Sequence, residues 1–292
     1  MAADRRPSAH VERIAHKLAC VPMTAVITFL SDYGGDDEFV GVCHGVMARI
    51  APDARVLDVT HGIDRHDVRS GALVLSRALP YFPPGVHLAV VDPEVGTSRR
   101  ALALRDRDGR LYVGPDNGLL VPAAERQGGI DAAHELTNRA FQLENVSATF
   151  HGRDVFAPAA AHLACGVELA ELGPAVEPDT LVRLDIPAPE VGRQRIRATV
   201  LYVDRFGNVQ LNVSREHLEA VGFLPGTRIE LVFPLERYYA MTARTFADAR
   251  PGDLILYEDS YGNIALAIRG GHAASMLRAT PGAELRIGPA PE

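Results

Sequence analysis

The stretch AVITFLSDYGGDDEFVGVCHGVMARI, residues 25–50, holds the pattern that decides the fold. Ala25–Leu30 is a short apolar run with β-branched residues, which is typical of a buried strand. Phe39–Ile50 has the apolar spacing of a helix and ends before Pro52. A strand that leads through a polar, glycine-containing loop into a helix is the repeating unit of an α/β sheet.

The same alternation continues to about Leu172 and predicts an α/β domain over residues 23–172, with a mostly parallel sheet covered by helices on both faces. A pair of strands is expected to turn at the sequence DRDG. The remaining expected elements are strands at Arg55–Val59, Val86–Val91, Ala101–Arg105 and Leu111–Val113, and helices at Asp67–Leu79, about Leu119–Gln127 and about Arg153–Cys165.

The composition and periodicity of the sequence change after Leu172. Residues 173–194, GPAVEPDTLVRLDIPAPEVGRQ, are rich in proline and lack periodicity, so they are predicted to be a linker. Residues 195–292 are predicted to form a smaller all-β domain, barrel-like or a compact sandwich. Its expected strands are Ile196–Val203, Val209–Val213, Thr227–Phe233, Asp253–Glu258 and Ile264–Ile268.

Composition limits the function classes. The net charge of −7 argues against a general nucleic-acid binder, and no apolar run approaches the roughly 18 residues of a membrane helix. The three cysteines stand singly, which favours reduced thiols and a cytoplasmic protein. Residues 1–22 lack the apolar segment of a signal peptide and are expected to be a poorly ordered extension, with Met23 as the natural start.

Ligands of open α/β sheets bind at the carboxyl ends of the strands, and the loop SDYGGDDEFVG lies at such an end. Asp32 is suited to accept hydrogen bonds from a vicinal diol such as that of a ribose, and Asp37 to pair with an ammonium group. Asp36 and Glu38 are interpreted as complementing the positive N-terminus of the following helix.

The loop THGIDRHD, residues 60–67, contains two histidines and two aspartates. Its spacing matches no zinc or non-haem iron signature, so no metal site is predicted there, and Asp67 is expected to cap the next helix. The turn PDNGLL, residues 115–120, is expected to be structural.

The stretch VVDPEVGTSRR, residues 90–100, places Asp92 at the end of a buried strand and Arg99 and Arg100 beyond a turn. Taken alone it could be a structural elbow, a binding site or part of a reaction centre. His151, in TFHGRD, lies at a strand–helix elbow, which favours a site residue. In VDRFGN, Asp204, Phe206 and Asn208 combine a carboxylate, an aromatic face and an amide, a set suited to a nucleobase, although taken alone the stretch is better explained as a plain hairpin turn.

Together, SDYGGDDEFVG, DVTHGI, VVDPEVGTSRR, VGPDNGLL, TFHGRD, VDRFGN and DSYGNIALAI resemble the S-adenosyl-L-methionine (SAM) hydroxide adenosyltransferases, or SAM hydrolases, which are relatives of the fluorinase and chlorinase. The resemblance implies hydrolysis of SAM to adenosine and L-methionine. It also implies a homotrimer in which substrate lies between the N-terminal domain of one subunit and the C-terminal domain of its neighbour.

The resemblance assigns the catalytic set to Asp92, Arg99 and His151, which activate a water. C5′ of SAM already has a neutral leaving group in its sulfonium, so neither a metal nor a further cofactor is required, and Arg99 is expected to keep Asp92 ionised. The resemblance assigns the substrate contacts to Asp32 on the ribose, Asp37 and Asp204 near the ammonium, Phe206, Asn208 and Phe246 at the adenine, and Ser260 near the carboxylate.

Two alternatives remain: a SAM-dependent halogenase and a non-catalytic SAM or adenosine sensor. The related halogenases have Tyr where this chain has Asp92 and Thr where it has Val95, and they carry a long insertion where this chain has only the DRDG turn. All three differences favour water over halide as the nucleophile. A sensor would be expected to have lost Asp92 or His151.

Glu94 departs from the family's usual glycine, and the expected consequence is a change in the loop's backbone angle or in the ionisation of Asp92. Tyr261, Asn263 and Ala265 also depart from the family's usual residues.

Overall fold

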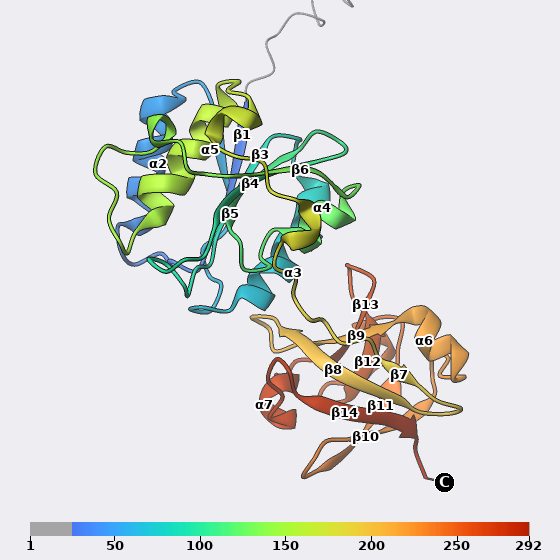
Figure 1. The fold of residues 1–292 in the computed structure, drawn as a ribbon. Coiled ribbons are helices and arrows are strands. Elements are labelled where there is room, and N and C mark those ends of the chain that lie inside the picture. The colour runs from blue at the N-terminus through green and yellow to red at the C-terminus, as the bar shows by residue number, and fades with distance from the viewer. Residues whose placement is uncertain (1–24, 292) are drawn as a thin grey trace, which may run out of the picture. The chain divides into compact units, whose positions relative to one another are not determined.

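The computed structural model describes residues 25–291, so the predicted extension over residues 1–22 lies outside the described part. The chain divides into two compact units, Met1–Leu184 and Asp185–Glu292 (Figure 1). The expected mixed α/β class, with a separate β unit after it, is confirmed. Each unit has its own hydrophobic core.

The N-terminal unit is built on a six-stranded sheet with the strand order β2-β1-β3-β5-β4-β6. The pairs β1–β2, β1–β3 and β3–β5 are parallel, and β4 is antiparallel to both of its neighbours. The strands are β1 (Val26–Ser31), β2 (Arg55–Thr60), β3 (Val86–Val90), β4 (Ala101–Asp106), β5 (Leu111–Pro115) and β6 (Ile130–Glu135). The mostly parallel sheet and the hairpin at DRDG are as predicted.

Helices cover both faces of this sheet: α2 and α5 lie together on one side, and α3 and α4 on the other (Figure 1). Ile27, Phe29 and Leu88 of the sheet pack against Met47 of α2 and Phe156 before α5. Alternate positions such as Thr28 and His87 therefore face the opposite layer. The helices are α2 (Phe39–Ile50), α3 (Val68–Ala78), α4 (Val121–Arg126) and α5 (Ala157–Ala164).

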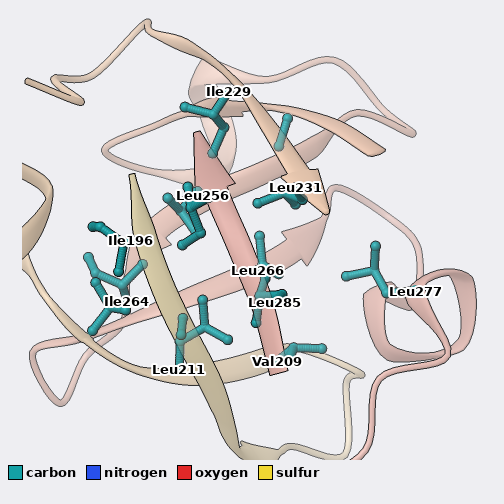
Figure 2. Close-up of a cluster of buried hydrophobic side chains, with 14 of the residues drawn as sticks. Ile196, Val209, Leu211, Ile229, Leu231, Leu256, Ile264, Leu266, Leu277 and Leu285 are labelled. Atoms are coloured by element: carbon teal, nitrogen blue, oxygen red, sulfur yellow. The ribbon is translucent and has the colours of Figure 1, made fainter. Parts of the chain in front are cut away.

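The C-terminal unit is a closed barrel. Strand β14 pairs with both β10 and β8, so the order β14-β10-β11-β12-β13-β9-β8 returns on itself, and β7 adds to β8. Leu211, Leu231, Leu256, Leu266 and Leu285 fill its interior (Figure 2). The elements are β7 (Glu190–Val191), β8 (Ile196–Val203), β9 (Val209–Ser214), α6 (Arg215–Ala220), β10 (Arg228–Val232), β11 (Arg237–Thr242), β12 (Leu254–Glu258), β13 (Asn263–Ile268), α7 (Ala273–Leu277) and β14 (Glu284–Pro289).

Four strands were missed from the sequence: β6 (IDAAHE), the two-residue β7 (EV) inside the predicted linker, β11 (RYYAMT) and β14 (ELRIGP). Each carries charged residues or few β-branched residues, and each is defined by its partner strand. The predicted helix at Arg153–Cys165 is also shorter, because a π-helical turn, η3 (Gly152–Phe156), precedes α5. Short 3₁₀ turns complete the chain at Leu79–Tyr81, Arg139–Phe141, Leu169–Leu172, Pro178–Thr180 and Phe246–Asp248.

The structure also bears on the expectations about membrane helices and cysteines. No helix among residues 25–291 is long and apolar enough to cross a membrane. Cys43 and Cys165 are both free thiols, one buried and the other exposed. Burial raises the pKa of Cys43 to about 12, so this thiol is protonated and packs as a small apolar side chain.

Candidate active site

The fold brings Asp92, Arg99 and His151 into direct contact. Arg99 binds the Asp92 carboxylate with two hydrogen bonds, Nη2 to Oδ2 at 2.5 Å and Nε to Oδ1 at 3.1 Å. The same Nη2 lies 3.0 Å from Nδ1 of His151. The side chains of Asp92 and Arg99 are only 6% and 3% exposed, so the pair is largely shielded from water.

Secondary structure places each member of this triad at the end of an element. Asp92 follows β3, Arg99 precedes β4, and His151 precedes the π-helical turn that leads into α5. The two loops approach closely at Gly96, which has φ of +80°; a Cβ there would lie 2.5 Å from the Ala148 carbonyl oxygen. Glycine at this position therefore allows the segment containing Asp92 and Arg99 to contact the segment leading to His151.

The hydrogen bonds also assign the His151 tautomer. An arginine can only donate, so Nδ1 of His151 accepts and the proton of the neutral ring is on Nε2. Burial, and then the Arg99 charge, lower the pKa of His151, which favours this neutral form. The imidazole therefore presents an N–H donor on its free side.

The ionisation of Asp92 differs from the sequence-based expectation in one respect. Burial raises the pKa of Asp92 above its ordinary value, and the two hydrogen bonds and charge of Arg99 only partly offset this. The carboxylate is thus a stronger base than an exposed aspartate. Arg99 lowers the pKa of Asp92, as expected, but does not outweigh desolvation.

Glu94 does not disturb this loop in the way that its substitution for glycine suggested. The non-glycine residues with positive φ among residues 25–291 are His66 and Arg278, so position 94 does not need glycine. The Glu94 backbone N–H donates to the Asp92 carboxylate, and its carbonyl accepts from the Thr97 hydroxyl at 2.7 Å. Its own side chain lies at an exposed position.

The PDNGLL turn is structural, as expected, and so is Arg100. Arg100 pairs with Asp116 at 2.5 Å and donates to the Thr180 carbonyl at 2.7 Å. Asn117 donates to the Val91 carbonyl at 2.8 Å, one residue before Asp92. These contacts hold the β3 end in place.

Asp32 lies at the end of β1 and is half-buried, while Asp37 is exposed just before α2. Oδ2 of Asp32 accepts from the His66 backbone N–H at 2.9 Å. A carboxylate has about four lone-pair positions, so Asp32 retains capacity for a diol.

Tyr33 is a site residue that the sequence did not single out. Burial, and then interactions with Cys43, Asp32 and Asp92, raise the pKa of Tyr33, so it lies near both carboxyls as a neutral phenol. A Cβ on Gly152 would meet the Tyr33 hydroxyl oxygen at 2.0 Å, which puts this phenol beside the His151 elbow. Its position directly after Asp32 was the only signal available.

Asp204, Phe206, Asn208 and Ser260, four of the residues predicted at the adenine and methionine ends, lie on two hairpins built from the same turn. DRFGN (204–208) joins β8 to β9, and DSYGN (259–263) joins β12 to β13. In each, an Asp Oδ1 accepts two backbone N–H groups and the glycine has φ near +80°, at +81° and +82°. Strands β9 and β13 pair directly, so the two turns belong to neighbouring hairpins.

These turns already use part of the predicted binding groups. Oδ2 of Asp204 accepts from the Asn208 side-chain amide at 2.7 Å, which leaves the Asn208 amide oxygen for a ligand. Phe206 is 76% exposed, and Phe246 packs on Tyr257 with ring centroids 4.8 Å apart. Ser260 is exposed in the second turn.

Two family models match the chain: the SAM hydroxide adenosyltransferase N-terminal domain over residues 27–173 and its C-terminal domain over residues 198–286. The chain belongs to the SAM hydroxide adenosyltransferase family. The resemblance seen in the seven motifs is thereby confirmed. The matched ranges include every residue of the proposed site.

Curated relatives of this SAM hydroxide adenosyltransferase family member include the (R)-S-adenosyl-L-methionine hydrolase of Salinispora tropica, which is 54% identical over 90% of this chain and 98% of that protein. A protein of the same name from Thermus thermophilus is 38% identical over 89% of this chain and 98% of its own length. A fluorinase from an Actinoplanes species is 32% identical over 83% of this chain and 90% of that protein. A crystal structure of an uncharacterised conserved protein from Thermotoga maritima superimposes with a TM-score of 0.83 at 35% identity, covering 90% of this chain and 99% of that one.

Proposed function

We propose that this protein hydrolyses S-adenosyl-L-methionine to adenosine and L-methionine. The observation that carries the proposal is the contact of Asp92 and His151 through Arg99, at the carboxyl end of β3, in a chain of the SAM hydroxide adenosyltransferase family. Relatives named SAM hydrolases share 54% and 38% identity with the chain, compared with 32% for the fluorinase.

The side chains divide the work of activating a water. His151 donates from Nε2 to the water oxygen and orients it, while Asp92 accepts a water proton as the new C5′–O bond forms. The C5′–S bond breaks, and its electron pair neutralises the sulfonium to give the methionine thioether. Asp92 is the preferred proton acceptor, since Nδ1 of His151 is occupied by Arg99 and Nε2 already holds a proton. No cofactor enters this scheme.

Substrate recognition follows from the chemistry of the remaining groups. Asp32 takes the ribose hydroxyls, Asp37 and Asp204 the ammonium, and Ser260 the carboxylate. The adenine is held by Phe206, Phe246 and Asn208. We propose that the protein is a cytoplasmic homotrimer that does not bind nucleic acid, with each site assembled from the N-terminal unit of one subunit and the C-terminal unit of its neighbour.

The reaction is tested by incubating purified protein with SAM, alone and with chloride or fluoride, and separating the products by chromatography. Adenosine plus methionine is expected, with or without halide; a halogenated nucleoside would establish a halogenase, and unchanged SAM with measurable binding would establish a sensor. Because the relatives are named for the (R) form, the two sulfonium epimers are assayed separately, and the (R) epimer is expected to be consumed. Asp92→Ala and His151→Ala should each reduce turnover by about 100-fold or more.

The shared-site arrangement is tested by mixing inactive variants. His151→Ala removes a group of the N-terminal unit, and Asp204→Ala removes one of the C-terminal unit. If each site combines two subunits, co-refolded mixtures recover activity, because some sites contain neither substitution. Failure to recover activity, in mixtures shown by light scattering to be trimers, would place the whole site within one chain.

A further inference from the structure

Three potential metal ligands converge at the β2 edge of the N-terminal sheet, separate from the Asp92–Arg99–His151 triad. They are His44 in α2, Asp58 in β2 and His61 just after β2. Nε2 of His44 lies 2.8 Å from Oδ1 of Asp58, and Nε2 of His61 lies 3.1 Å from the same oxygen. One ligand atom from each residue lies within 4.8 Å of the other two.

The surrounding structure holds both imidazoles in place. Their rings pack on Phe29, whose centroid is 4.6 Å from that of His61 and 6.0 Å from that of His44. Phe29 is fully buried and pairs with Asp58 in the β1–β2 register. Nδ1 of His61 is 2.7 Å from the buried Ser31 hydroxyl, a contact of the kind that orients metal-binding histidines.

Ordinary hydrogen bonding does not account for the whole cluster. His44 forms a hydrogen bond with Asp58, but Nε2 of His61 is buried and has no hydrogen-bond partner, despite its proximity to the same carboxylate oxygen. A buried polar atom without a partner is costly. A cation placed between the three residues would bind this nitrogen and both of the other ligand atoms.

The geometry points to a divalent transition-metal site formed by His44, Asp58 and His61, with Zn²⁺ as the expected ion. Two imidazole nitrogens and one carboxylate oxygen suit a transition metal, whereas Mg²⁺ and Ca²⁺ prefer oxygen ligands. The side chains of His44 and Asp58 are 35% and 43% exposed, so water has access to complete the coordination.

The connections of this site indicate a stabilising role rather than a step in the reaction. An ion there would link α2 to β2 and to the loop that follows β2. The carbonyl of His61 accepts from the Gly34 backbone N–H at 2.8 Å, and the backbone of His66 in the same loop donates to Asp32. Metal binding is therefore expected to hold in place the loop that contacts the proposed ribose-binding carboxylate.

The site is tested on the full chain, freed of any affinity tag and treated with a chelator. Zn²⁺ binding is measured by competition with a chromophoric chelator, Co²⁺ binding by its visible absorption, and the effect of each ion on the melting temperature by circular dichroism. The wild type is expected to bind one ion per chain at this site and to melt at a higher temperature with Zn²⁺.

Variants locate the binding, since the chain has 11 histidines that could take up zinc adventitiously. Asp58→Asn and His44→Gln change partly exposed side chains with little change of shape, and each should weaken Zn²⁺ binding at least tenfold and abolish the rise in melting temperature. His66→Asn is the matched control from the same loop: asparagine tolerates its φ of +67°, and Zn²⁺ affinity should be unchanged. Absence of stoichiometric binding to the wild type, or equal affinity in the wild type and Asp58→Asn, would overturn the assignment.

Discussion

Replacing Arg99 with glutamine tests the electrostatic role that the structure gives it. The substitution removes the cation that makes two hydrogen bonds to Asp92, in a pair whose side chains are 6% and 3% exposed. Breaking a buried pair by removing one partner costs about 3–5 kcal/mol, because the remaining charge is left uncompensated. Protonation of Asp92 relieves part of this cost, so the pKa of Asp92 should rise above its already raised value.

The size of the shift follows from the same energies. One pKa unit corresponds to about 1.36 kcal/mol, so if about 2.7 kcal/mol of the cost is relieved by protonation, the pKa of Asp92 rises by about 2 units. Asp92 must be ionised to accept the water proton. The rate therefore falls as the pH drops through this pKa, and the acid limb of the profile should move to higher pH by about 2 units in Arg99→Gln.

The assay is the pH dependence of kcat/KM for adenosine formation, measured where circular dichroism shows the variant to be folded. Arg100→Gln is the matched control, since the neighbouring arginine pairs with Asp116 and not with Asp92. It should lower stability without moving the acid limb. An acid limb at the same pH in Arg99→Gln and the wild type would refute the proposal that ionised Asp92 is the base.

Three further predictions use other parts of the molecule. Gly152→Ala should reduce activity and stability, because the new Cβ would lie 2.0 Å from the Tyr33 hydroxyl oxygen. Adding Tyr33→Phe should restore part of both, since the nearest remaining ring atom, Cζ of residue 33, lies 3.0 Å away, and a double-mutant cycle without rescue would contradict this steric cause. Burial lowers the pKa of His87 to about 3, so between about pH 6.5 and 3 the unfolded chain binds a proton that the folded chain does not, and wild-type stability decreases as the pH is lowered through this window. Urea titrations should show that His87→Gln loses less stability than the wild type, by about 1.4 kcal/mol per pH unit, and equal slopes for the two proteins would exclude the effect. Phe206→Ala should raise the KM for SAM about tenfold or more, because a stacking contact with the adenine is lost. The melting temperature should not change, since the side chain is 76% exposed, and an unchanged KM would show that Phe206 does not contact the adenine.

Local sequence patterns were sufficient for most of the architecture. The apolar run of β1 followed by the helical spacing of α2 predicted the α/β unit, and turn residues between short apolar runs predicted the β unit. The missed strands, β6, β7, β11 and β14, all carry charged residues, and β7 has only two residues. They exist because a neighbouring strand supplies hydrogen-bond partners, and such pairing is not visible in a local window.

The candidate site divides in the same way. Asp92 and Arg99 are seven residues apart on one turn, so their pairing was within reach of the sequence, and the family resemblance added His151. The contact of His151 with Arg99 spans 52 residues, and it is this contact that assigns the tautomer and favours Asp92 as the proton acceptor. The net direction of the Asp92 pKa also depends on burial, which no motif reports.

The histidine-containing loop THGIDRHD shows the limit most clearly. Its own spacing predicted no metal, and only His61 of that loop belongs to the cluster; the other two ligands come from α2 and β2. By itself the sequence determined the order of the elements, the turns and the chemical groups available, because these depend on neighbouring residues. The tertiary structure alone decided which distant groups meet and how far each is removed from water, because contacts and desolvation arise only when the sheet and its helices pack together.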